Sequence, residues 1–249
     1  VGLAVIPFDT GELAGWREDR LFISASAPKS WWTAAALANG QAEAAAQFAG
    51  PVFEVSSDGA AGSMIDLAGG IDAVNDFTLS VGMTDTAAIK WHHGRRRESA
   101  QFPGPLNGSN HVDASDAALF FYELGTNQVL TPDLTELLAE WMRRSPRDVA
   151  THPADPEAST IPDSLPADVK ELVEQKAGWL RPGEYSVPAH LLAVGIVRPT
   201  NGASPYAIAM MSVGGDRPVF ARVIEFFQAA SCRIYVHQAD DTSWTCPAW

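Results

Sequence analysis

The sequence predicts an α+β fold: an αβα sandwich built on an antiparallel sheet, with an all-helical lobe inserted into it. Apolar runs typical of strands occur near both ends of the chain, whereas the segments between them have helical periodicity. The chain has 249 residues, of which 46% are hydrophobic, so it can bury a sizeable core. We therefore expect strands from both chain ends to share one sheet.

The N-terminal segment predicts a hairpin followed by a helix. Residues 1–7 form a short apolar run, a turn follows at Gly11, and a second run covers residues 20–24. Residues 30–48 are rich in Ala, Leu and Trp and predict a helix, although Gly40 weakens its middle.

The middle of the chain predicts four more helices and one long loop. The last helix begins at Thr131-Pro132-Asp133, where Thr131 suits the N-cap and Pro132 the first helical position. Residues 91–112 have little apolar periodicity, and a loop of this length in a compact domain is usually functional. The four predicted helices cover residues 60–68, 71–81, 113–124 and 131–144.

The C-terminal third predicts the rest of the sheet. A connector rich in Pro, Asp and Ser is followed by three strands and a closing helix with apolar residues on one face. The connector covers residues 145–168, the strands 170–177, 190–197 and 206–213, and the helix 219–230. We expect one domain, 1–249, in two lobes: an α/β lobe of residues 1–25 and 166–232, and a helical lobe of residues 26–165. Residues 233–249 would form a C-terminal extension.

Charge excludes several partners. The formal net charge is −13, from 17 Lys and Arg against 30 Asp and Glu residues. Nucleic acids and anionic membranes require clustered cations, but the one basic run, Arg95-Arg96-Arg97, is short. No stretch approaches the ~20 apolar residues of a membrane span, and the chain does not begin with a signal peptide. We expect no nucleic-acid partner and no transmembrane segment in this chain.

The two cysteines, Cys232 and Cys246, lie near the C-terminal end. An even count across a short loop is compatible with a disulfide in an oxidising compartment, and two buried free thiols are the alternative. Neither cysteine has a neighbour at the spacing of zinc ligands, so we expect no metal.

The first candidate for chemistry is the S-x-x-K pattern of Ser26 and Lys29. Residues three apart share one face of a helix, so the lysine amine can approach the serine hydroxyl. A serine hydroxyl is a weak nucleophile that needs a base, and a buried neutral lysine can accept its proton. The alternative is a helix start at which Ser26 is only a cap.

The order of strand, turn, strand, S-x-x-K and Ala-rich helix resembles the serine β-lactamases of class A and the penicillin-binding D,D-peptidases. The resemblance implies their fold, with Ser26 as nucleophile and Lys29 as base. It also implies a second motif like S-D-N, for which Ser57-Asp58-Gly59 is the candidate. Ser57 would relay a proton to the leaving group.

A third motif, like K-T-G, is expected on a strand after the helical lobe. Lys176-Ala177-Gly178-Trp179 stands there. By the resemblance, Lys176 would supply a positive charge that binds a substrate carboxylate, and Gly178 would let substrate approach the strand. The backbone N–H groups of Ser26 and Trp179 would form the oxyanion hole.

The sequence also departs from the family pattern. Gly59 replaces an Asn whose amide holds the substrate and contacts the catalytic lysine, and Ala177 replaces a Thr. The deacylating carboxylate of class A lies four residues before the Asn of a Leu-Asn pair; counted from Asn107, that position is Pro103, and Glu98 is the nearest loop carboxylate. Since deacylation needs a positioned base, an efficient β-lactamase is not expected.

Two functions follow from these residues. The first is a serine acyl hydrolase or acyltransferase of the penicillin-recognising type, without cofactor or metal, acting on a small-molecule or peptide-like acyl substrate. The second is an inactive β-lactamase-like binding protein of the cell envelope. Either would be exported, as an extracellular, periplasmic or lipid-tethered protein whose signal is absent from this chain.

Overall fold

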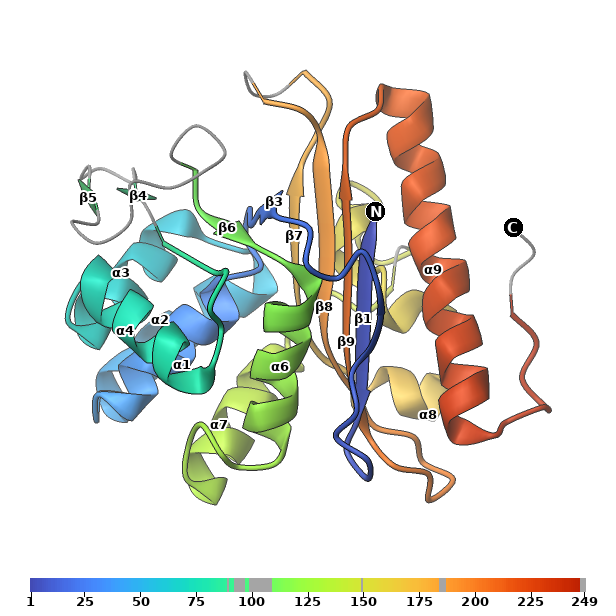
Figure 1. Ribbon diagram of the computed structural model, residues 1–249, viewed down its shortest axis with the longest axis horizontal. Helices are drawn as coiled ribbons and strands as arrows, with labels where there is room; N and C mark the ends of the chain where they lie inside the picture. The colour runs from blue at the N-terminus through green and yellow to red at the C-terminus, as the bar shows by residue number, and fades with distance from the viewer. Residues whose placement is uncertain (89, 92–96, 99–108, 149, 184–186, 247–249) are drawn as a thin grey trace.

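The computed structural model describes residues 1–88, 90–91, 97–98, 109–148, 150–183 and 187–246 (Figure 1). A five-stranded antiparallel sheet has helices α1 to α4, α6 and α7 on one side and the long helix α9 on the other (Figure 1). The strand order is β2-β1-β9-β8-β7. The strands are β1 (Gly2–Pro7), β2 (Ala14–Trp16), β9 (Tyr206–Val213), β8 (His190–Val197) and β7 (Glu174–Leu180).

The two ends of the chain meet in this sheet, as the sequence predicts. Strand β1 pairs with β9 from Gly2 opposite Met211 to Pro7 opposite Tyr206. The predicted α+β fold with an antiparallel sheet is therefore confirmed.

The predicted hairpin has a different second strand. Strand β1 turns through Gly11, at a φ of +66°, and pairs with β2, with Leu3 opposite Trp16. Residues 22 and 23, placed in the hairpin by the sequence, form β3 (Phe22–Ile23) and pair with β6 (His111–Val112). The turn brings the nearer segment back onto β1, whereas the fully buried Phe22 lies in the core.

The helix expected over residues 30–48 is two helices, α1 (Lys29–Ala38) and α2 (Ala42–Glu54). They are separated at Gly40, which has a φ of +74°. This left-handed conformation favours glycine and ends a helix. The residue that weakens the predicted helix is thus the point where it breaks.

The other helices before the C-terminal strands agree with the sequence prediction to within a few residues. They are α3 (Asp58–Ala68), α4 (Ile71–Val81), α6 (Ala114–Gly125) and α7 (Pro132–Met142). Helix α6 packs against β1, β8 and β9 and so joins the helices to the sheet.

The predicted loop 91–112 contains short strands among its described residues. Strand β4 (Lys90–Trp91) pairs with β5 (Arg97–Glu98), which includes the candidate carboxylate residue Glu98. Pro103 and the Leu-Asn pair at 106–107 lie outside the described residues.

The C-terminal third differs in its boundaries. The strand expected over 170–177 begins later, at Glu174, after the short helix α8 (Ala167–Lys170). The connector also contains two 3-10 turns, η1 (Pro156–Ser159) and η2 (Pro162–Ser164). Helix α9 (Arg217–Ala239) is longer than the predicted 219–230, so residues 233–239 belong to it rather than to an extension.

A disulfide joins the end of the chain to α9. Cys232, on the helix, is bonded to Cys246, with the two Cα atoms 5.6 Å apart. Within the described ranges, no helix is long and apolar enough to cross a membrane.

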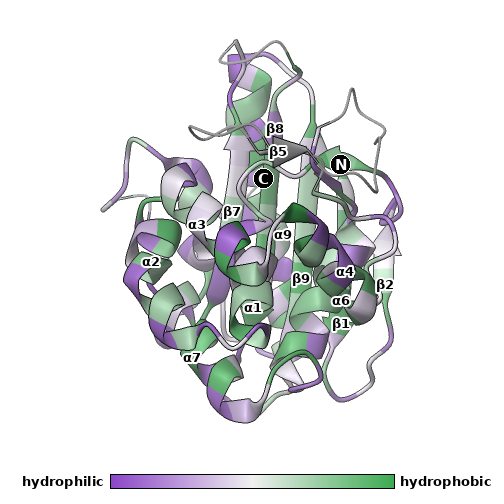
Figure 2. Ribbon diagram, turned by 90° about the vertical axis from the view of Figure 1, so that its left-hand side faces the viewer, coloured by the Kyte–Doolittle hydropathy of each residue, from purple (hydrophilic) through white to green (hydrophobic). Residues whose placement is uncertain are grey.

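Hydrophobic residues fill both sides of the sheet. One buried cluster lies between the helices α1 to α4, α6 and α7 and one sheet face, and a second lies between the other face and α9. In Figure 2, strands β8 and β9 are coloured largely as hydrophobic, whereas the outer helices alternate. This packing fixes β7, at the sheet edge, beside the start of α1.

Candidate active site

Lys29 is the first residue of α1 and is 1% exposed. Its Nζ donates hydrogen bonds to the Ser56 carbonyl oxygen at 2.5 Å, to Ser56 Oγ at 3.1 Å and to Asp58 Oδ1 at 2.5 Å. Burial lowers the pKa of Lys29, and the Asp58 carboxylate opposes this shift.

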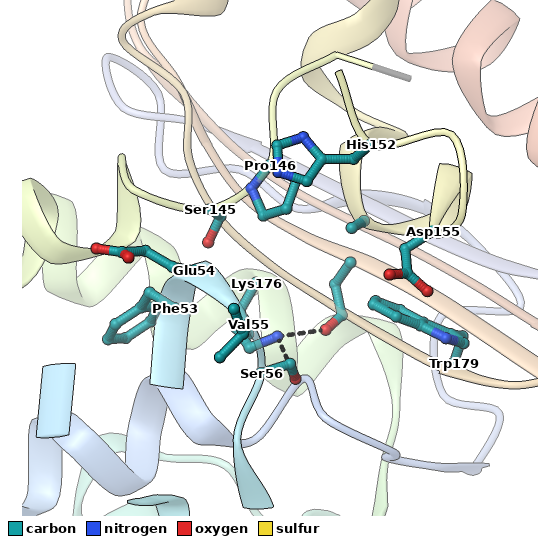
Figure 3. A pocket seen from close by; sticks show the side chains of 12 residues that line it. Phe53, Glu54, Val55, Ser56, Ser145, Pro146, His152, Asp155, Lys176 and Trp179 are labelled. Atoms are coloured by element: carbon teal, nitrogen blue, oxygen red, sulfur yellow. Dashed lines mark hydrogen bonds between the residues drawn. The ribbon is translucent and has the colours of Figure 1, made fainter. Parts of the chain in front are cut away.

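Lys176 approaches the same place from strand β7, where it is 3% exposed. Its Nζ donates to Ser56 Oγ at 3.0 Å and to its neighbour's carbonyl, Ala177 O, at 2.9 Å (Figure 3). Within the described chain it makes no ion pair. Burial, and then the positive charge of Lys29, lower the pKa of Lys176 well below its ordinary value.

The hydroxyl between the two lysines belongs to Ser56, not to the expected Ser57. Ser56 lies in the link between α2 and α3 with a φ of +54°, and its Oγ contacts both amines. Ser57 is the N-cap of α3 and accepts a hydrogen bond from Ala60 N at 3.3 Å. The second motif is therefore shifted by one residue, because the helix start occupies Ser57.

The shift also changes which residue meets the lysine. Asp58, rather than Gly59, contacts Lys29. Gly59 is exposed in the first turn of α3, and a Cβ built there would meet only Ser57 Oγ, at 3.9 Å. A carboxylate thus stands where the resemblance leads us to expect an amide.

Ser26 lies beside strand β7 at the approach to α1. A Cβ added to Gly178 would be 2.7 Å from Ser26 N and 2.6 Å from Ala27 N, so only glycine fits there. Ala25, just before the serine, has a φ of +46°. Strained backbone at a non-glycine residue often marks a functional site, and here it occurs next to Ser26 and at Ser56.

Among the described residues, Lys29 Nζ makes no hydrogen bond with the Ser26 hydroxyl. Among the described residues, Lys29 Nζ bonds to Ser56 and Asp58 and not to Ser26. The two residues are one turn apart at the start of the helix, where the Lys29 N–H donates to the Ser26 carbonyl at 3.3 Å.

A cavity of about 170 Å³ opens beside Ser56 and Lys176 (Figure 3). Trp179 and Asp155 lie toward one end of it and Phe53 toward the other (Figure 3). The side chains combine hydroxyl, imidazole, carboxylate and apolar groups. The lining residues are Phe53, Glu54, Val55, Ser56, Ser145, Pro146, His152, Asp155, Ala158, Lys176, Ala177 and Trp179.

The structure thus brings together Lys29, Lys176, Ala177 and Trp179 with the serine at position 56. The sequence motifs do not single out Ser56, Asp58 or the cavity residues from the connector, such as His152. One sequence signal bears on Ser56: a Ser just before a helix is a strong N-cap, and a capping Ser57 leaves Ser56 to face the lysines. The connector residues carried no such signal.

Chemically, the cluster has the parts of an acyl-transfer site. Two amines of lowered pKa share one hydroxyl, and Ser26 lies one helical turn from Lys29. A lysine whose pKa is lowered by burial can act as a general base.

Comparisons with known proteins identify the family and the fold of the chain. The profile of the Beta-lactamase enzyme family matches residues 45–238, while a search of curated protein sequences finds no match. The chain has the fold of PBP-A, with a TM-score of 0.70, 18% identity, and coverage of 96% of this chain and 89% of that chain.

Two further structures have the same fold. One is a mutant of the class A β-lactamase of the last common ancestor of Gram-negative bacteria, with a TM-score of 0.70, 18% identity, and coverage of 97% of this chain and 93% of that one. The other is a PBP-A mutant as an acyl-enzyme complex with penicillin G, with a TM-score of 0.70, 20% identity, and coverage of 96% and 90%. With the profile spanning most of the sequence, the chain belongs to the β-lactamase enzyme family.

Proposed function

We propose that this protein is a serine acyl hydrolase or acyltransferase that works through an acyl-Ser26 intermediate. The observation that carries the proposal is the Ser56 hydroxyl, held 3.1 Å from Lys29 Nζ and 3.0 Å from Lys176 Nζ. Two buried lysines that converge on one hydroxyl lower the stability of the fold, because burial disfavours the charged amine. A catalytic role explains why the fold retains them.

The proposed reaction begins when the neutral Lys29 amine accepts the proton of Ser26 Oγ. The Oγ–carbon bond then forms at the substrate carbonyl, and the backbone N–H groups of Ser26 and Trp179 receive the developing oxyanion. Ser56 passes a proton to the leaving group as its bond to the acyl carbon breaks. Lys176 stabilises negative charge near Ser56.

The acyl-enzyme is resolved by water or by another acceptor. Pro103, the residue at the expected position of the deacylating base, cannot accept a proton. We therefore expect slow deacylation and poor β-lactamase turnover. The penicillin G acyl-enzyme of the PBP-A mutant makes penicillins the first probes for the site.

An inactive binding protein of the cell envelope is the second candidate. It is favoured by the contact of Lys29 Nζ with Asp58 Oδ1 at 2.5 Å, since a paired ammonium is a poor base. Under either function we propose that the protein is exported, because the Cys232–Cys246 disulfide is suited to an oxidising compartment.

Intact-protein mass after incubation with a penicillin, a cephalosporin and a fluorophosphonate tests the proposal. We expect a stable adduct on the wild type and none on Ser26→Ala. An adduct that survives in Ser26→Ala would overturn the assignment of the nucleophile, and no adduct with any probe on the wild type would favour the binding protein.

A matched pair of variants tests which serine is the relay. Ser56→Ala should slow adduct formation by about 100-fold or more, as expected when a proton-transfer group is lost. Ser57→Ala should leave that rate within a few fold and lower stability by about 1 kcal/mol through the lost helix cap. The reverse pattern would restore Ser57 as the relay.

A further inference from the structure

Two buried lysines meet at the Ser56 hydroxyl, and one of them has a carboxylate partner. Lys29 and Lys176 are 1% and 3% exposed, and their Nζ atoms lie 3.1 and 3.0 Å from Ser56 Oγ. The Asp58 carboxylate is 2.5 Å from Lys29 Nζ. In the part of the chain that the structure describes, Lys176 Nζ contacts Ser56 Oγ and the Ala177 carbonyl but no carboxylate. The described site therefore offers one counter-charge to two buried amines.

Two ammonium groups in this arrangement would disfavour each other. Through the shared oxygen, the two nitrogens are at most roughly 6 Å apart, and like charges at that distance repel each other strongly away from bulk water. Burial of each amine acts in the same direction, because it disfavours the charged form. A single positive charge on the pair avoids the repulsion, and the carboxylate beside Lys29 balances it.

The Ser56 hydroxyl can move that charge from one lysine to the other. A hydroxyl accepts and donates hydrogen bonds at the same time, and a neutral amine can accept a proton. When Lys29 gives a proton to Ser56 Oγ, the original hydroxyl proton can pass to Lys176. One N–H bond is lost at the first amine and one is gained at the second, so no proton enters or leaves the site. The result is a neutral Lys29, the form that can accept the Ser26 proton.

The other ionisable groups around the cavity do not take part in this exchange. Glu54, His152 and Asp155 line the cavity, and Asp155 Oδ1 is paired with Arg181 at 2.7 Å. Among the described residues, none of the three that line the cavity is within hydrogen-bond distance of either lysine Nζ. The carboxylate bonded to Lys29 therefore decides where the charge rests, and it favours that lysine.

We propose that Lys29 and Lys176 share one positive charge through Ser56, and that Lys176 takes the proton that Lys29 must lose before it can act as the base. This inference rests on the proposed acyl-transfer function and explains how a lysine paired with a carboxylate can still accept the proton of Ser26. That proton moves to Lys29, the Oγ–carbon bond forms, and Ser56 gives its proton to the departing group. Lys29 then reprotonates Ser56. The charge held by Lys176 during the step is the one that stabilises negative charge near Ser56.

Acylation by penicillin G at several pH values, followed by intact-protein mass, tests the transfer in the wild type and in Lys176→Met. In the wild type the proton stays within the pair, so the acylation rate should change little between about pH 7 and about pH 9. In the variant, Lys29 has to lose its proton to solvent, so the rate should rise by about tenfold per pH unit below the pKa of Lys29. The variant should be about 100-fold slower than the wild type near pH 7 and approach it near pH 9.

Two further variants separate the explanations. Lys170→Met removes a lysine of α8 that does not line the cavity, so its pH profile should match that of the wild type. Ser56→Ala should stay slow at every pH, because the path between the amines is lost. Parallel profiles for Lys176→Met and the wild type would show that Lys176 contributes only a fixed charge, and recovery of Ser56→Ala at high pH would show that Ser56 is not the path. Either result would overturn the inference.

The lysine signals of the protein test the shared charge without any substrate. The chain has four lysines, so isotope-labelled lysine gives few NMR signals, which the Lys176→Met and Lys170→Met variants help to assign. Near neutral pH we expect one charged and one neutral amine for the pair, and a charged Lys170. Two charged amines, or two neutral ones, would overturn the inference even in a protein that acylates. If no penicillin acylates the wild type, one charged and one neutral amine would support the shared charge in a binding protein, and the proposed function alone would fail.

Discussion

Replacing Lys176 by Met should make the protein more stable while disabling the site. Lys176 is buried in β7 and, within the described chain, has no carboxylate partner. Among the residues that the structure describes, its Nζ donates to Ser56 Oγ and Ala177 O alone. Methionine has similar length and no charge, so the substitution removes the desolvation penalty and keeps most of the packing.

The magnitude follows from the burial of Lys176. Relieving a buried charge typically gains about 1–4 kcal/mol. Taking about 2 kcal/mol, the melting temperature of a chain this long should rise by roughly 4–8 °C near neutral pH. Acylation should fall by about 100-fold through the lost stabilising charge.

The stability gain of Lys176→Met should depend on pH, and the lowered pKa of Lys176 fixes the direction of that dependence. A lysine with a depressed folded pKa binds fewer protons than its unfolded form, so its penalty is largest at low pH and disappears as pH rises toward 10.5. The advantage of Lys176→Met should therefore shrink between about pH 7 and about pH 9.5.

Calorimetric melting at both pH values measures the effect, with Lys170→Met as the control. Lys170 has acidic partners, with its Nζ 3.5 Å from Asp148, so its loss should bring no gain. If Lys176→Met melts lower than the wild type at neutral pH, or its advantage does not change with pH, the account of Lys176 as an uncompensated buried cation is wrong.

Four further variants test other features. Gly178→Ala should slow acylation by at least about tenfold, because its Cβ would lie 2.7 Å from Ser26 N. Gly59 lies in open space, so Gly59→Ala should leave the acylation rate unchanged and add up to about 1 kcal/mol of helix stability. A normal acylation rate in Gly178→Ala would show that strand β7 can move to accommodate the added methyl group. Burial, and then neighbouring acids, raise the pKa of Asp116 to about 6, so its charge destabilises the fold as pH rises from about 4 to about 6. Asp116→Asn should then gain up to about 3 kcal/mol in urea melts near pH 7.5 and little near pH 4, and an equal effect at both would contradict this. Cys246→Ser should lose about 3 kcal/mol by removing a short covalent loop, and an unchanged melting temperature with and without reductant would show that the bond adds nothing.

The sequence predicted the sheet and most helices because their periodicity is local. The strands at 190–197 and 206–213 and the helix at 71–81 have the predicted boundaries. Each of these elements is bounded by turn residues, and its apolar residues follow a single pattern along its whole length. The order of strands and helices also predicts that strands from both chain ends share one sheet, and the pairing of β1 with β9 confirms this.

The errors occurred where two local signals competed. A serine that caps a helix and a serine that faces a cleft look alike in sequence, so the motif predicts Ser57 where the structure places Ser56 between the lysines. Gly40 weakens a helix whether or not the chain breaks there, and the break is seen only in its left-handed φ in the structure. The hairpin partner of β1 depended on where a short turn ended.

The carboxylate at Asp58 could not be recognised as a site residue from spacing alone. Its contact with Lys29 depends on the one-residue shift of the motif, which only the start of α3 reveals. Residues of the cavity wall such as Ser145 and His152 come from an irregular connector, whose apolar residues follow no helical or strand period.

The pairing of β1 with β9 has a consequence for the order in which the protein can fold. The helices α1 to α4 rest mainly on near-neighbour contacts and can form early, whereas the sheet must wait for strands separated by most of the chain. Ser56 and Lys176 are 120 residues apart and meet only when β7 takes its place at the sheet edge. During synthesis, the half of the site on the helices is exposed before its second lysine exists, so the hydroxyl of Ser26 gains its full surroundings only in the last stage of folding.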